Sequence, residues 1–319
     1  MQIVSLMLPI FLPIALGYVL LRLRIFTPAI AESLLKYLMY ATFPAVIISN
    51  MVGKHFSDLF HLQYTLATII GLIIMYGSTY VLYKYFFSCS ISDNAMAALS
   101  TSFVSSGIVG LPIMVGIIGV DNTVVPVIVS TMMSLIIVVP ITVFLIKSHQ
   151  KGADKKSFIG IFDDTLIDVV KNPLVASSVL GMLIVLFGIQ IPSALTETLK
   201  KVGDATFGTA LVAIGAGINI QTLKKNIWEI SFLASLRVVL FTIVGFALAL
   251  AFKLPAPLAV AFVMIMALPT AKSVPSIGQE YNVFASDSIQ LVTVTTLSMI
   301  IVIPLVVYFA DILWPGIIM

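Results

Sequence analysis

The second half of this chain repeats the first at a constant offset of 164 residues. Pro9 and Gly17 reappear as Pro173 and Gly181. The same offset relates Pro28 to Pro192, residues 35–36 to 199–200, residues 41–43 to 205–207, Gly53 to Gly217, and residues 134–140 to 298–304. One offset kept from Pro9 to Pro140 is not expected from chance similarity between apolar segments. It therefore indicates an internal duplication.

The composition places most of this duplicated chain in lipid. Of the 319 residues, 60% are hydrophobic and only 10% are charged, with a mean hydropathy of +1.14. A soluble domain usually carries about 25% charged residues. The net charge of +3 does not indicate nucleic-acid binding, because the basic residues lie mainly in short loops between apolar segments.

The residue types that bind metals are scarce. Cys89 is the single cysteine, which excludes an intramolecular disulfide and a cysteine-rich metal site. The three histidines, His55, His61 and His149, are far apart in the sequence. We therefore expect neither a metal nor a cofactor.

Apolar runs long enough to cross a hydrocarbon layer of about 30 Å occur five times in each half. They cover residues 3–21, 34–52, 64–86, 94–119 and 122–146, and then 172–189, 202–220, 228–252, 256–281 and 287–312. Because five is an odd number, the second copy must enter the membrane upside down. The sequence thus predicts an all-α polytopic membrane protein with ten transmembrane helices in two inverted five-helix repeats. Secondary transporters typically have this architecture.

We expect three parts: residues 1–147 as the first repeat, 148–171 as a cytoplasmic connector, and 172–319 as the second repeat. The connector alternates apolar residues with acidic ones, which favours an amphipathic helix on the inner membrane face. With the N-terminus outside, ten basic residues lie in inner loops and four in outer loops. The chain is therefore predicted to lie in the cell membrane with both termini outside.

Spans four and nine carry helix-breaking residues at equivalent places in the two halves. Residues 105–112 read SSGIVGLP, and residues 267–278 read ALPTAKSVPSIG. Pro removes a backbone donor and Gly permits irregular dihedrals, and free backbone groups survive in a membrane only inside protein or along a watery cavity. We predict two broken helices that cross in mid-membrane, where their positive amino ends form an anion site. The alternative is a pair of ordinary proline kinks.

The predicted substrate-binding residues come from these two breaks. They are Ser105, Ser106, Gly107, Gly110 and Pro112 from span four, and Pro269, Thr270, Ala271, Lys272, Ser273 and Pro275 from span nine. Their hydroxyls and amides would bind a carboxylate, and Lys272 would balance its charge. A lysine deep in a span costs about 2.5–3.5 kcal/mol, so it needs a partner or a cavity. The alternative is a lysine that snorkels or bonds a backbone carbonyl at the break.

Other polar and irregular positions have structural interpretations. Arg237, about a third of the way into span eight, is interpreted as a snorkelling side chain that helps to set orientation. The alternative for Arg237 is a substrate contact. Phe43, Pro44, Asn50 and Gly215 are supporting residues, with helix packing as the favoured role and contact with the substrate as the second.

The motifs at these residues resemble those of the auxin efflux carrier family, which includes plant auxin exporters and bacterial permeases for malate or malonate. Residues 107–112 are similar to the family's Gly-x-x-Gly-Ile-Pro motif, and residues 171–173, 267–269 and 280–283 also match its pattern. The resemblance covers essentially the whole chain. It implies crossing helices, a fixed scaffold bundle, a moving transport bundle with an elevator-type mechanism, small carboxylate substrates and a homodimer.

The chain departs from this family pattern at three positions. Family members commonly have Asn at the position of Ser105, plant members have Pro at that of Val104, and relatives have a small or apolar residue at that of Lys272. Sodium can bind at the break in related crossed-helix folds. Because relatives have a small or apolar residue there, Lys272 would define a distinct substrate or a distinct mode of coupling. Its ammonium could alternatively replace the sodium ion of those related folds.

The expected function is secondary active transport of a small organic anion, driven by the membrane potential, a proton or another ion such as sodium. The sequence contains no nucleotide-binding loop for primary pumping. The alternative is a membrane-embedded carboxylate sensor that retains the transporter fold and signals through residues 148–171. An intramembrane enzyme is not expected, because His-Glu-x-x-His and paired intramembrane aspartates are absent.

Overall fold

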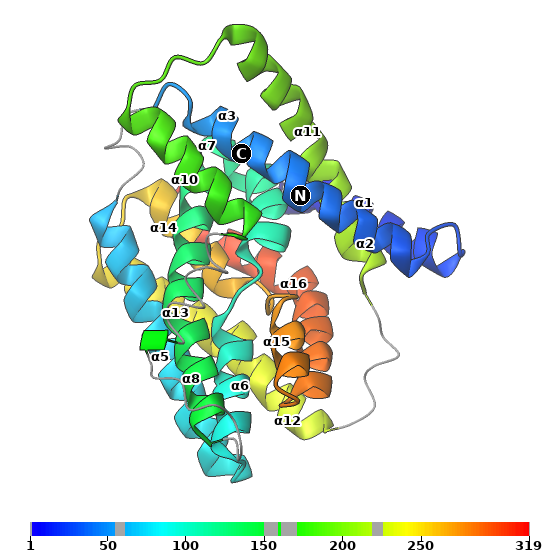
Figure 1. The fold of residues 1–319 in the computed structure, drawn as a ribbon, viewed down its shortest axis with the longest axis vertical. Helices are drawn as coiled ribbons and strands as arrows, with labels where there is room; N and C mark the ends of the chain where they lie inside the picture. The colour runs from blue at the N-terminus through cyan, green and yellow to red at the C-terminus, as the bar shows by residue number, and fades with distance from the viewer. Residues whose placement is uncertain (1, 55–60, 150–158, 161–170, 219–225, 319) are drawn as a thin grey trace.

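The computed structural model describes residues 2–54, 61–149, 159–160, 171–218 and 226–318, where all regular secondary structure is helical (Figure 1). The elements, with π-helical turns labelled η, are α1 (Gln2–Arg22), α2 (Pro28–Tyr37), η1 (Leu38–Thr42), α3 (Phe43–Met51), α5 (Leu62–Phe87), α6 (Ile91–Ser102), η2 (Ser106–Gly110), α7 (Leu111–Met133), η3 (Ser134–Val138), α8 (Val139–His149), α10 (Pro173–Leu186), α11 (Ser193–Ala216), α12 (Ile227–Ser235), η5 (Leu236–Leu240), α13 (Phe241–Ala251), α14 (Ala256–Ala267), α15 (Val274–Glu280) and α16 (Ala285–Leu313). The predicted amphipathic helix of the connector lies almost entirely outside the described residues.

Several helical stretches have the length and apolarity of membrane spans. Within the described ranges these are Pro28–Met51, Leu62–Phe87, Ser106–His149, Ile227–Ala251 and Ala285–Leu313. Shorter apolar helices cover Leu6–Arg22, Pro173–Leu186 and Ala256–Ala267. The prediction of an all-helical chain is confirmed for the described residues, and these apolar helices fit a membrane protein. The count of ten spans and their inversion stay predictions.

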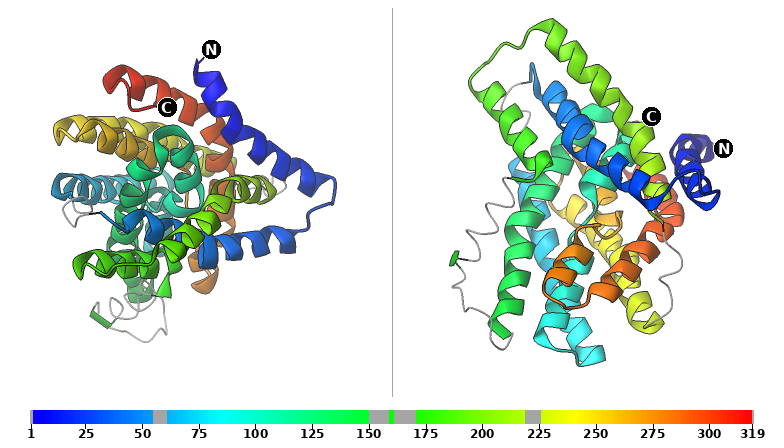
Figure 2. Two further views of the ribbon diagram at one scale, coloured as in Figure 1. Left: turned by 90° about the horizontal axis from the view of Figure 1, so that it is seen from above. Right: turned by 45° about the vertical axis from the view of Figure 1, so that its right-hand side comes forward.

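The helices form two groups (Figures 1 and 2). In the first group, which lies along the upper part of Figure 1, α11 packs against α1, α2 and α3, and α10 packs against α3. The second group contains α5 to α8 and α12 to α16, with α5 on α6 and α13 on α14. Helix α7 contacts α10 and α11 of the first group as well as α14 of the second. The site described below lies where these groups meet.

Two glycines hold the first group together. A Cβ atom built at Gly17 of α1 would overlap the carbonyl oxygen of Val212 in α11, and one at Gly215 would overlap that of Ile14. The backbones of α1 and α11 are therefore in direct contact, as small residues permit between membrane helices. Any side chain at either position would force the two helices apart.

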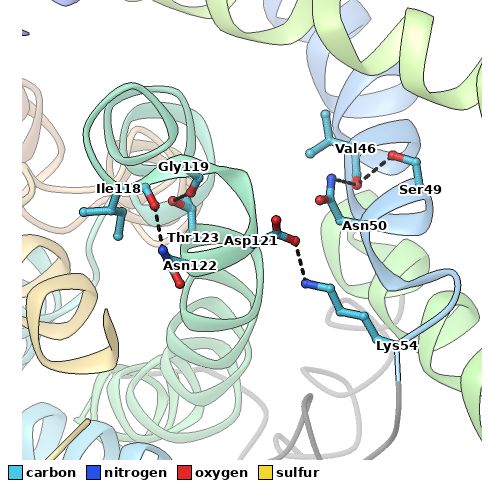
Figure 3. A network of polar contacts seen from close by, with 9 residues as sticks. All are labelled: Val46, Ser49, Asn50, Lys54, Ile118, Gly119, Asp121, Asn122 and Thr123. Carbon is cyan, nitrogen blue, oxygen red and sulfur yellow. Dashed lines mark hydrogen bonds and ion pairs between the residues drawn. The ribbon is translucent and has the colours of Figure 1, made fainter. Parts of the chain in front are cut away.

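The long stretch Ser106–His149 contains a sharp kink at Gly119. This residue has φ 77° and ψ 164°, a conformation that glycine adopts without strain. Just after it, Asn122 Nδ2 donates to the carbonyl of Ile118 at 2.8 Å and Thr123 Oγ1 to that of Gly119 at 2.7 Å (Figure 3). The kink lies between the predicted spans four and five and separates them.

Candidate substrate site

Two helices are interrupted, and their interruptions lie against each other. Helix α6 ends at Ser102 before η2 begins at Ser106, and α14 ends at Ala267 before α15 begins at Val274. Val104 and Thr270 form an isolated antiparallel bridge between the two gaps. We call residues 103–105 and 268–273 the junction. It joins the segments in which the sequence predicted broken helices.

Backbone hydrogen bonds tie the two sides of the junction together. The Ser105 amide donates to the Pro269 carbonyl at 2.9 Å, and the Ala271 amide donates to the Phe103 carbonyl at 2.9 Å. The Thr270 amide donates to Thr295 Oγ1 at 3.2 Å. Groups freed by the interruptions thus find partners within the protein, which is the condition for irregular backbone in a membrane.

The carbonyl that α6 leaves free is capped by a neutral hydroxyl. Thr270 Oγ1 donates to the Ser100 carbonyl at 2.7 Å across the junction. The Val104 amide, which would bond that carbonyl in a continuous helix, lies beyond the end of α6. Val104 is paired there with Thr270, and the Ser105 and Ala271 amides donate the two hydrogen bonds of that pair. The two interrupted helices therefore depend on each other for their hydrogen bonds.

Most of the predicted site residues are buried in or beside the junction. They are Ser105, Ser106, Gly107, Gly110, Pro112, Pro269, Thr270 and Ala271. The hydroxyl of Ser106 bonds that of Thr131 at 2.8 Å, and the Thr270 hydroxyl bonds Ser100 as described above. These hydroxyls have protein partners in this conformation, so direct substrate contact by them stays a prediction.

Lys272 and Pro275 have a different environment, because both line a large cavity of about 760 Å³. Lys272 is half-buried, whereas its neighbour Ser273 is exposed. The other lining residues are Leu21, Arg22, Arg24, Pro28, Ala31, Glu32, Leu35, Ala216, Gly217, Ile218, Ile289, Val292 and Thr293. Because Arg22, Arg24 and Glu32 are exposed, the cavity runs from the surface to the edge of the junction.

The Lys272 ammonium lies at the end of α11. A Cβ atom built at Gly217 would be 2.5 Å from Lys272 Nζ and 3.4 Å from the carbonyl oxygens of Ala213 and Ile214. The last carbonyls of a helix carry partial negative charge, which favours a cation there. The missing side chain of Gly217 leaves the space that the ammonium occupies.

Positive charge predominates in this cavity. Arg22, Arg24 and Lys272 line it, and Glu32 is the acidic residue among its lining. The carboxylate of Glu32 is engaged by Lys36 Nζ at 2.8 Å. Arg22 is held by Tyr18, whose hydroxyl accepts from Arg22 Nε at 2.9 Å. A concave surface of one sign concentrates ligands of the opposite sign, so the cavity suits an anion.

The interpretation of Arg237 as a snorkelling side chain is wrong. Arg237 is 0% exposed, and it donates from Nη1 to the Met266 carbonyl at 2.6 Å and from Nη2 to the Ile265 carbonyl at 3.3 Å. The interruption of α14 leaves these carbonyls without their full set of helical partners. The guanidinium points inward and donates to these carbonyls, because they are hydrogen-bond acceptors and lipid tails are not.

Comparison with known proteins identifies the family. A family model described as membrane transport protein matches residues 2–307. This chain belongs to that family. The resemblance to the auxin efflux carrier family is thereby confirmed, and the protein is a membrane transporter.

Two relatives are similar to this transporter over nearly its whole length. "Uncharacterized transporter YfdV" of Escherichia coli (strain K12) is 26% identical, over 95% of this chain and 96% of its own. "Putative malonate transporter" of Rhizobium meliloti (strain 1021) is 22% identical, over 93% of this chain and 92% of its own.

The supporting residues of this transporter do not line the cavity that contains Lys272. Phe43 is fully buried, Pro44 is half-buried in the first turn of α3, and Gly215 lies in the α1–α11 contact. Asn50 donates to the Val46 carbonyl at 2.9 Å and lines a second cavity of about 440 Å³. That cavity also contains Lys54, Asp121, Lys200 and Asp204.

Sequence reasoning missed Gly217, Arg22 and Arg24 as residues around Lys272. Gly217 repeats Gly53 at the constant offset, and this match could have marked Gly217 as a candidate site residue. The two arginines resemble ordinary loop residues, and only the fold brings them to the same cavity as Lys272. Within the described ranges, no three His, Cys, Asp or Glu side chains lie close enough to hold a metal ion.

Proposed function

We propose that this transporter carries a small organic anion, a mono- or dicarboxylate, by secondary active transport. One observation carries the proposal: the Lys272 ammonium lines a surface-connected cavity of about 760 Å³ together with Arg22 and Arg24. Among the described residues no carboxylate forms an ion pair with Lys272. A substrate carboxylate would supply the missing negative charge. The name of the Rhizobium relative, "Putative malonate transporter", supports a dicarboxylate.

The proposal includes ten spans in two inverted repeats. Its support is reciprocal packing: α1 packs on α11, and α10 packs on α3. The first helix of each predicted repeat thus contacts the second predicted span of the other repeat. Ser105 and Pro269, which the 164-residue offset equates, are hydrogen-bonded to each other across the junction. An approximate two-fold relation between the halves would produce both features.

The proposal also includes an elevator-type motion. The first group of helices would be the fixed scaffold and the dimer interface, and the second group, with both interrupted helices, would move against it. With both termini outside, the cavity at Arg22 and Arg24 opens to the cytoplasm. Lys272 would travel with the moving group, either replacing a bound sodium ion or acting beside a coupling proton or ion.

On the opposite side, an ion pair joins the two groups. Lys54, just after α3, bonds Asp121 Oδ1 at 3.0 Å next to the Gly119 kink (Figure 3). Because Lys54 is 26% and Asp121 77% exposed, this pair contributes only about 0.5 kcal/mol. It would favour the conformation in which the outer side is closed.

Reversal of one charge in this pair is expected to shift the transporter toward the outward-open conformation by a small factor. Lys54→Glu places a carboxylate opposite Asp121, and we expect about a two- to threefold gain in labelling of an introduced outer-side cysteine. The double variant Lys54→Glu/Asp121→Lys restores opposite charges and should restore the original labelling rate. Equal labelling in all three proteins would show that this contact does not influence the conformation.

Uptake by the purified protein in proteoliposomes tests the proposed function. We expect saturable uptake of radiolabelled malonate or a related carboxylate, measured with an imposed membrane potential, with a pH gradient, and with or without sodium. Protein-free liposomes are the control. Binding of a carboxylate without flux would identify the sensor alternative. No binding by any mono- or dicarboxylate in a thermal-shift screen would overturn the proposal.

A further inference from the structure

Arg237 is the one charged side chain that is fully buried in the described part of the chain. It lies in η5, near the middle of the Ile227–Ala251 stretch that is long and apolar enough to span a membrane. Its Nε has no hydrogen-bond partner among the described residues. A membrane protein keeps such a residue at a substantial energetic cost, which points to a function for the charge itself.

The guanidinium contacts the end of α14, immediately before the junction. The Met266 carbonyl would accept from the Thr270 amide in a continuous helix, but that amide donates to Thr295 Oγ1 instead. Arg237 Nη1 takes its place at 2.6 Å. The end of an interrupted helix carries about half a negative charge, which would repel an anion near the junction. Arg237 neutralises this end and leaves an excess of positive charge.

The two interrupted helices differ in this respect. Thr270 caps the Ser100 carbonyl of α6 with a neutral hydroxyl, whereas a full positive charge caps α14. At position 73, which the repeat equates with Arg237, the chain has Ile, and this side chain is 57% exposed. Hydrogen bonding at the end of α14 could be supplied by a neutral donor, as it is in α6. The charge is therefore the distinctive contribution of Arg237.

We infer that Arg237 is a positioning and specificity-determining residue that sets a positive electrostatic potential at the junction and so favours substrates with two negative charges over those with one. It acts through the end of α14 and without touching the substrate. This inference rests on the proposed function, because it needs an anion at Lys272. It adds a second fixed charge to the one at Lys272.

An electrostatic effect that acts at a distance scales with the charge of the ligand. Two unit charges roughly 10 Å apart at an effective dielectric constant of about 20 interact strongly enough to change affinity about tenfold. Loss of the Arg237 charge should therefore weaken a monoanion about tenfold and a dianion about a hundredfold. A purely structural defect would weaken both ligands by the same factor.

The experiment compares malonate with monomethyl malonate, which is a monoanion of similar shape. Dissociation constants are measured for the full-length protein in detergent, for Arg237→Gln and for Arg237→Lys. Gln retains a hydrogen-bond donor without the charge, whereas Lys retains the charge. We expect the ratio of the two affinities to fall about tenfold in Arg237→Gln and to change less than about threefold in Arg237→Lys.

The outcomes separate this inference from the proposed function. Wild-type protein that binds neither ligand would contradict the proposed function for these substrates, and with it the basis of the inference. Wild-type protein that binds both, together with an unchanged ratio in folded Arg237→Gln, would overturn the inference alone. If Arg237→Gln does not fold, Arg237→Lys decides: a ratio kept near wild type supports the inference, and a lost ratio overturns it.

Discussion

Malonate binding is expected to weaken by about a hundredfold or more in Lys272→Ala. The ammonium lines the cavity of about 760 Å³, and the acidic lining residue Glu32 is already paired with Lys36. Removal of the ammonium would leave a bound carboxylate without its counter-charge at the edge of the junction. The dissociation constant measured by calorimetry or thermal shift, and uptake in proteoliposomes, report the effect.

Two further variants distinguish loss of charge from loss of fold. Lys272→Arg keeps the charge and should retain measurable binding. Gly217→Ala adds a methyl group at a position 2.5 Å from Lys272 Nζ, and it is compatible with the backbone because φ of Gly217 is −86°. We expect it to displace the ammonium and to weaken binding by about tenfold without loss of thermal stability. Unchanged affinity in Lys272→Ala would refute the role of counter-charge.

Gly215→Val is expected to prevent folding or to lower the melting temperature by roughly 10 °C. Any side chain at Gly215 overlaps the backbone oxygen of Ile14 in α1, and a rigid backbone cannot move aside as a flexible side chain can. Separation of α1 from α11 would disrupt the contact that holds the first group of helices together. Overpacking of this kind typically costs 1–3 kcal/mol and occasionally more.

The matched control is Gly208→Val in the same helix. An added Cβ at Gly208 meets no atom within 4 Å, so this variant tests only the lower helix propensity of valine. We expect its melting temperature in detergent to stay within a few degrees of wild type. Similar melting temperatures for the two variants would mean that the α1–α11 contact does not limit stability.

The sequence was sufficient to predict helical structure and the two interruptions. The sequence predicted new helices at Pro112 and Pro275, and these residues lie in the first turns of α7 and α15. Pro269 lies between the end of α14 and the start of α15. The repeat then indicated that the two segments are related. These features are local or periodic, and a single chain displays them without knowledge of the fold.

Two features could not be predicted in the same way. The inward orientation of Arg237 depends on carbonyls of Ile265 and Met266, which are in another helix and become available only because α14 is interrupted. The proximity of Lys272 to Gly217 likewise depends on how the junction meets the end of α11. Such contacts between distant segments leave no periodic signal in a single sequence.

The junction also constrains how this protein can be made. The Ser105 amide is completed by Pro269 and the Phe103 carbonyl by Ala271, so each half of the chain supplies what the other lacks. A nascent chain that has inserted only its first half would leave these groups unpaired in lipid. Biosynthesis must therefore shelter an unfinished half until the second emerges. A half-length chain would need a second segment to complete the same groups.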